Sequence, residues 1–187
     1  MKAFFCLFLA LISLAACQPS AETNQTKSYF DLKGFIETQI RELEKRKPTV
    51  EKKMTLDGES DTKQTNDIRW DKELDLFIQA DLNKQAYQLS YETTQPSPRT
   101  NLYTLKKSES KPVQSMKVTF DDKTQMPVSI DVVLREENKL YDSEKQLHLT
   151  CGMRPEGVWM IKSYVISGFQ HLSLTDKKTF SISGTLF

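Results

Sequence analysis

The segments Met116-Lys117-Val118-Thr119-Phe120 and Val128-Ser129-Ile130-Asp131-Val132-Val133-Leu134 largely alternate apolar and polar side chains. Successive side chains of a β-strand point to opposite faces, so each segment presents one apolar and one polar face. The residues between them, Asp121-Asp122-Lys123-Thr124, provide a turn signal. The two segments therefore predict neighbouring antiparallel strands, with one face of the sheet on a core and the other in water.

The same pattern recurs along the second half of the chain. Further short apolar or alternating segments cover residues 87–91, 102–105, 140–151, 158–169, 172–174 and 180–186. They are separated by turn residues, of which Pro96-Ser97-Pro98, Gly152 to Gly157 and Asp176-Lys177-Lys178 are the clearest. Because no helical segment lies between them, these strands predict an antiparallel meander rather than βαβ units.

Residues 28–47 carry the strongest helical pattern of the chain. Their apolar residues recur at helical spacing, and they are Tyr29, Leu32, Phe35, Ile36, Ile40 and Leu43. Ser28 is the expected N-cap, with Asp31 three residues on as a weak capping box. Pro48 is expected to end the helix.

Residues 50–65 predict a β-hairpin around the two-residue turn Asp57-Gly58. The return strand, Glu59 to Thr65, has no apolar side chain, so we expect it at a sheet edge or as an exposed arm. A second amphipathic helix is expected from Asn66 or Asp67 onward. Its sheet-facing side would carry Trp70, Leu74, Phe77 and Ile78, and its solvated side Asp71, Glu73 and Asp75.

These elements together predict an α+β fold for residues 28–187, taken as one domain. Two amphipathic helices are expected to pack on a curved, mostly antiparallel sheet that ends in a C-terminal β-meander. The 26 Lys and Arg residues balance 25 Asp and Glu residues. A near-neutral chain has no basic footprint for nucleic acid, so we expect no nucleic-acid partner.

No known catalytic or ligand-binding motif is present in the sequence. We find no Gly-x-Ser-x-Gly, phosphate-binding glycine loop, His-Glu-x-x-His or Cys-x-x-Cys pattern, and we expect no metal, no cofactor and no catalytic residue. The two histidines, His148 and His171, mark where an enzyme site would lie if there were one. Cys151 lies in an apolar strand and is expected to be a core residue.

The N-terminus has the three parts of a secretory signal. Lys2 is followed by the apolar run from Ala3 to Leu14, and then by Ala15-Ala16-Cys17. Leu14-Ala15-Ala16-Cys17 resembles the lipobox of bacterial lipoprotein precursors. The resemblance implies a signal peptide over residues 1–16, cleavage between Ala16 and Cys17, and a diacylglycerol, usually with a third acyl chain, on Cys17. The membrane would then be a partner of the protein through this lipid.

Residues 17–27 lack apolar periodicity and are expected to form a flexible tether. Gln18 stands where an Asp often retains lipoproteins at the inner membrane, so the resemblance implies the outer membrane if the cell has one. Residues 20–27 contain one acidic residue, Glu22, and not the acidic run that sends some lipoproteins to the cell surface. We therefore expect the protein to face the periplasm. Residues 66–74, together with 80–84, also look similar to segments of small envelope lipoproteins of Gram-negative bacteria, a resemblance that implies no activity.

Three functions remain open at this stage. The first is a non-enzymatic adaptor for another envelope protein, which predicts a bare edge strand such as Glu59 to Thr65 or an exposed patch. The second is a carrier of lipid or another apolar ligand, by analogy with lipoprotein-sorting carriers. Its cavity would be lined by Trp70, Phe77, Met116 and Trp159. The third is an enzyme with a site near His148 or His171.

Overall fold

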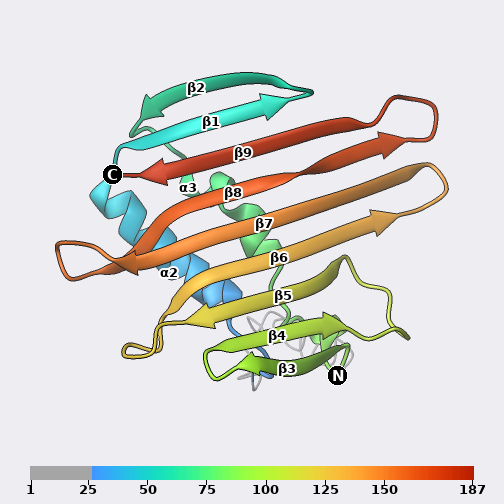
Figure 1. The fold of residues 1–187 in the computed structure, drawn as a ribbon, viewed down its shortest axis with the longest axis horizontal. Helices are drawn as coiled ribbons and strands as arrows, with labels where there is room; N and C mark the ends of the chain where they lie inside the picture. Colours follow the sequence, from blue (N-terminus) through green and yellow to red (C-terminus); the bar gives the residue numbers. More distant parts are fainter. Residues whose placement is uncertain (1–26) are drawn as a thin grey trace, which may run out of the picture.

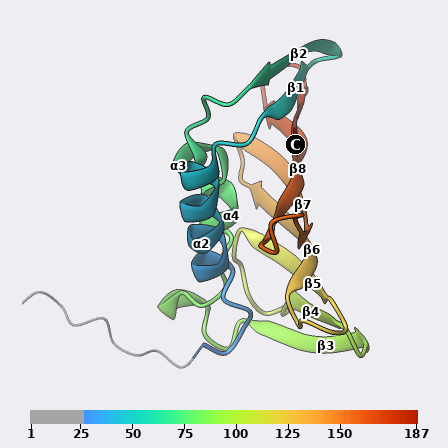
Figure 2. The same cartoon turned by 90° about the vertical axis from the view of Figure 1, so that its left-hand side faces the viewer.

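The computed structural model of the protein describes residues 27–187. The predicted signal peptide, the cleavage position at Ala16 and Cys17, and nearly all of the tether lie outside the described residues. Residues 27–187 contain a single large antiparallel sheet of nine strands, with helices on one of its faces (Figure 1 and Figure 2). The predicted α+β class is confirmed.

The strands are β1 Val50–Leu56, β2 Glu59–Thr65, β3 Tyr91–Ser97, β4 Thr100–Leu105, β5 Val113–Phe120, β6 Pro127–Glu137, β7 Tyr141–Met153, β8 Trp159–Leu172 and β9 Lys178–Leu186. Their order in the sheet is β2-β1-β9-β8-β7-β6-β5-β4-β3. From β3 to β9 each strand pairs with the next one in sequence, which is the predicted meander. The β1–β2 hairpin around Asp57-Gly58 is also present, and it extends the sheet beyond β9.

Helix α2 spans Leu32–Arg46 and is the one long helix of the described residues. Its N-cap is Asp31, whose carboxylate accepts a hydrogen bond from the Gly34 N–H, so the prediction of a start at Ser28 is wrong. The reason is tertiary: the N–H groups of Tyr29 and Phe30 donate to Asn83 and to the Tyr103 hydroxyl. These backbone groups are satisfied outside a helix.

The second predicted helix is wrong as a continuous element. The chain forms α3, Trp70–Glu73, and α4, Asp75–Gln79, which meet at Leu74, and a 3-10 turn follows over Gln85–Tyr87. Neither short helix has a side-chain cap, and helices of this length are not stable alone. Their backbone is positioned by what their side chains bury against the sheet, not by helical propensity.

The core lies between the sheet and the helices. The side chains that the alternation in β5 and β6 directs toward the helices are fully or almost fully buried, and they include Met116, Val118, Ile130 and Val132. A buried amide fixes α2 to the sheet. Gln39 donates to the Trp159 carbonyl at 3.3 Å and accepts from the Ile161 N–H at 2.9 Å.

The two edges of the sheet differ. The edge strand β3 contains Pro96 and an irregular register between Thr94 and Ser97, which protects it from further pairing. β3 begins at Tyr91 and not at Tyr87, because Leu89 has a positive φ of 64° and turns the chain. At the opposite edge, β2 pairs with β1 over seven consecutive residues without an irregularity. Figure 1 shows the two edges at opposite ends of the sheet.

Candidate binding surface

Helices α2, α3 and α4 cover the same face of the sheet, and Figure 2 shows no other element of residues 27–187 on the opposite face. We call this bare side the open face. One line of cross-strand partners runs across it, and we call this line the central row. In the order of the strands from β4 to β2, the central row consists of Leu102, Lys117, Asp131, His148, Val165, Ser183, Lys53 and Thr62.

A charged cluster forms the middle of the central row. Asp131 on β6 lies between Lys117 on β5 and His148 on β7. One Asp131 oxygen lies 2.6 Å from His148 Nδ1, and the other lies 3.0 Å from the Lys117 ammonium. Each of the three side chains is about one-third to one-half exposed. The half-buried Leu102 and Val165 flank the cluster.

The cluster changes the acidity of Asp131. Partial burial opposes ionisation of its carboxyl group, but hydrogen bonds from His148 and Lys117 outweigh burial and lower the pKa of Asp131. The folded protein therefore holds Asp131 as an anion that is already paired on both oxygens. A group whose pKa is lowered in the folded state stabilises the protein at pH values above its unfolded pKa.

Replacing Asp131 by Asn tests this pairing. We expect the substitution to lower the unfolding free energy by about 0.5–1 kcal/mol at pH 7, a figure reduced for solvent screening of this exposed cluster. As pH falls below about 4, the Asp131 carboxyl of the unfolded chain takes up its proton first, so the difference between variant and wild type should shrink. It should be lost as pH falls through the lowered pKa of the folded Asp131. Denaturant unfolding of the detergent-solubilised protein across pH 3–7 measures it. The exposed turn variant Asp122→Asn is the control, and an equal pH dependence in both variants would contradict the pairing.

The Asp131–His148 pair has the form of a base held by an orienting carboxylate, but the described hydrogen bonds join no hydroxyl or thiol to His148. The nearby Thr150 and Ser163 hydroxyls bond to each other at 2.6 Å. His171 lies opposite Asp142 in the register, about 20 Å along the strands from His148. The two histidines therefore do not belong to one site.

Cys151 is buried, as predicted, and burial raises the pKa of its thiol far above the usual range. A neutral, enclosed thiol is a poor nucleophile. It lies on the helix side of β7, whereas His148 is on the open face, as the strand alternation predicts.

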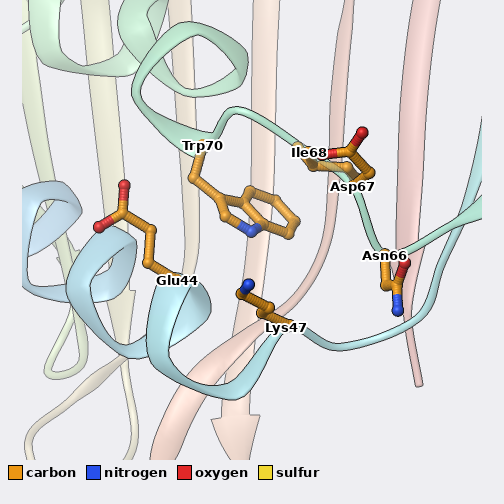
Figure 3. A pocket seen from close by; sticks show the side chains of 6 residues that line it. All are labelled: Glu44, Lys47, Asn66, Asp67, Ile68 and Trp70. Carbon is orange, nitrogen blue, oxygen red and sulfur yellow. The ribbon is translucent and has the colours of Figure 1, made fainter.

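The four predicted lining residues of a carrier cavity lie on the helix side. Phe77, Met116 and Trp70 are at most 2% exposed and belong to the packed core, while Trp159 is partly buried and donates to the Pro127 carbonyl at 2.9 Å. Trp70 also borders a surface hollow of about 330 Å³ between the end of α2 and the link from β2 to α3 (Figure 3). The other residues around this hollow are Glu44, Lys47, Asn66, Asp67 and Ile68.

The sequence predicts Glu73 on a solvated helix face, and this prediction is wrong. The Glu73 side chain reaches toward the sheet. Its carboxylate accepts from the Lys52 ammonium at 2.6 Å and from the Tyr164 hydroxyl at 2.7 Å. Burial and the hydrogen bond to Glu73 raise the pKa of Tyr164. These contacts connect α3 to β1 and β8, so Glu73 has a structural role.

Comparison of the chain with protein-family models, curated proteins and solved structures gives no match. Within residues 27–187, no group of three or more His, Cys, Asp and Glu side chains is placed to hold a metal ion. The same residues contain no helix long and apolar enough to cross a membrane.

Sequence reasoning identified His148 as a candidate but missed Asp131 and Lys117. The three residues are spread over 32 positions of the chain and meet only through the register of three strands. The sequence does show one property that the three residues share. Each occupies a polar position in a strand that alternates polar and apolar side chains.

Proposed function

We propose that this protein is a lipid-anchored, non-enzymatic adaptor of the cell envelope that binds another protein on its open face. In this proposal Cys17 carries the lipid, and residues 17–27 form the tether. The anchored protein belongs to the outer membrane and faces the periplasm. The lipobox-like sequence Leu14-Ala15-Ala16-Cys17 supports the anchor.

The central row is the observation that carries the binding role. Its Asp131 cluster is partly desolvated, and half-buried apolar side chains lie on both sides of it. Apolar contact area supplies affinity in protein interfaces, while paired charges supply register and specificity. Because the cluster lies on the middle strands of a continuous sheet, its side chains are held by regular backbone pairing on both sides.

Site-specific photocrosslinking tests the open face. A benzoylphenylalanine placed at Val133, beside Asp131, is expected to capture a protein partner in intact cells. The same probe at Lys33, on the exposed side of α2, is the matched control and is expected to capture little. Asp131→Lys tests specificity, because it places a second positive charge beside Lys117. We expect it to reduce the Val133 adduct about tenfold and to leave the protein in the membrane fraction.

Equal adducts from Val133 and Lys33, or a Val133 adduct that Asp131→Lys does not change, would contradict the open-face proposal. The anchor is measured separately, by the membrane fraction of the same samples.

A further inference from the structure

The edge strand β2 is regular and entirely polar. Its seven residues Glu59-Ser60-Asp61-Thr62-Lys63-Gln64-Thr65 are all polar, and it contains neither a proline nor a bulge. Within the described residues, no salt bridge involves Asp61 or Lys63. Charged side chains such as Lys63 disfavour unselective pairing at an edge. A regular edge without a proline or a bulge can still pair with a strand whose charges match its own.

Six backbone groups of β2 point outward along this edge. Phe187 donates its N–H to the Thr49 carbonyl, so the odd-numbered residues of β1 direct their backbone toward β9. By alternation, the even-numbered residues of β1 bond to the odd-numbered residues of β2, their partners in the register. The N–H and C=O groups of Ser60, Thr62 and Gln64 therefore point away from the sheet.

We infer that β2 pairs with β2 of a second copy of this chain, antiparallel and centred on Thr62. In this register Thr62 lies opposite Thr62 of the other copy, and Ser60 lies opposite Gln64. These pairs satisfy the six outward backbone groups of each copy with six hydrogen bonds in total. Asp61 of each copy lies opposite Lys63 of the other, so the edge is complementary to itself in charge as well as in backbone.

The two neighbouring registers have poorer charge pairing and satisfy fewer outward backbone groups. A two-fold axis at Asp61 keeps two pairs of opposite charge, Glu59 with Lys63, but adds two directly opposed Asp61 carboxylates. An axis at Lys63 directly opposes two ammonium groups. Each of these registers pairs four of the six outward groups instead of six. Directly opposed like charges destabilise a strand pair, whereas opposite charges stabilise it. The register centred on Thr62 is therefore the most complementary of the three.

The position of β2 in the fold is compatible with two anchored copies. The two-fold axis of an antiparallel strand pair is perpendicular to the sheet, so both helix layers lie on the same side of the combined sheet. The described chain begins on this side, near β4, where Phe30 binds Tyr103, at the end of the sheet opposite β2. Two tethers can thus reach one membrane from the two far ends of the dimer.

Dimerisation also extends the proposed binding surface. The central row ends at Lys53 and Thr62, and the Thr62 pair joins it to the central row of the second copy. A seven-residue edge alone is a small interface, but two anchors in one membrane raise the effective concentration of the copies. This last step rests on the proposed anchor; the pairing of the edges does not.

Cysteine crosslinking of the full chain in its membrane tests the pairing. Thr62→Cys places two thiols on opposed residues about 5.5 Å apart between Cα atoms, within disulfide range. With diamide as the oxidant, we expect a disulfide-linked dimer. Ser60→Cys alone is the matched control because Ser60 faces Gln64 of the other copy. It should crosslink weakly alone and strongly when co-expressed with Gln64→Cys.

Charge reversal gives the decisive readout. In the Thr62→Cys background, Asp61→Lys and Lys63→Asp should each reduce the yield of dimer about tenfold, because each opposes like charges at two symmetric positions. Co-expression of these two variants with tags of different size restores opposite charges at both positions, so the mixed dimer should return to the wild-type yield. Both side chains are exposed, so neither change threatens the fold.

The proposal is overturned if Thr62→Cys crosslinks no better than Ser60→Cys alone. It is also overturned if charge reversal leaves the dimer unchanged, or if the mixed variants fail to recover it. None of these results depends on the Val133 adduct, so failure of the dimer and failure of the open-face proposal are distinguishable.

Discussion

Replacing Cys17 by Ala is expected to move the protein almost completely from the membrane fraction to the soluble fraction. Acyl chains contribute about 0.8 kcal/mol per buried CH₂, so two or three long chains hold a protein on a bilayer effectively permanently. The helices of residues 27–187 offer no spanning segment to replace them. Ultracentrifugation of lysed cells, followed by immunoblotting of both fractions, measures the change.

Cys6→Ala is the matched control, because Cys6 lies in the same N-terminal segment but in the apolar run before the predicted cleavage position. This variant should remain in the membrane fraction. Mass analysis of the wild-type protein should find the chain beginning at an acylated Cys17. A Cys17→Ala protein that stays on the membrane, or a wild-type protein with a bare Cys17 sulfur, would contradict the anchor.

The strands could be predicted from sequence because a period of two is a local property. In β5 and β6, the apolar phase carries Met116, Val118, Ile130 and Val132, and these side chains are buried. A shift of one residue in register would point all of them toward solvent. Burial of the apolar side chains and the alternation in the sequence therefore favour the same pairing. Turn residues such as Asp57-Gly58 then fix which neighbours pair.

The helical elements were harder to predict because tertiary contacts override local signals there. Ser28 is a good capping residue in isolation, but the backbone that follows it binds Asn83 and Tyr103, far along the chain. Glu73 looks like one of several exposed acidic residues. It is held instead between Lys52 and Tyr164, which are separated from it by 21 and 91 positions.

The charged cluster on the open face shows why this candidate site could not be predicted from the sequence alone. The sequence shows that Asp131 and His148 are polar positions of strands, but not that the two are cross-strand partners. That relation depends on the length of the β6–β7 turn and on the register it imposes. The charge symmetry of β2 likewise depends on which of its backbone groups point outward, and that is set by its pairing with β1.

Replacing Phe77 by Ala is expected to cost about 3–5 kcal/mol of unfolding free energy. Phe77 is fully buried in the core, and removing its ring leaves a cavity between α4 and the sheet. We expect a loss at the upper end of this range, because α4 is five residues long and has no side-chain cap. Its position therefore depends on the side chains that it buries.

Thermal unfolding of the detergent-solubilised protein, followed by circular dichroism, measures this loss. A change of this size lowers the Tm of a domain of this length by about 10 °C. Gln79→Ala, an exposed position on the same short helix, is the matched control and should change the stability by less than about 0.5 kcal/mol. A loss below about 1 kcal/mol for Phe77→Ala would mean that α4 does not pack on the sheet through this ring, and that the space beneath it is open to a ligand.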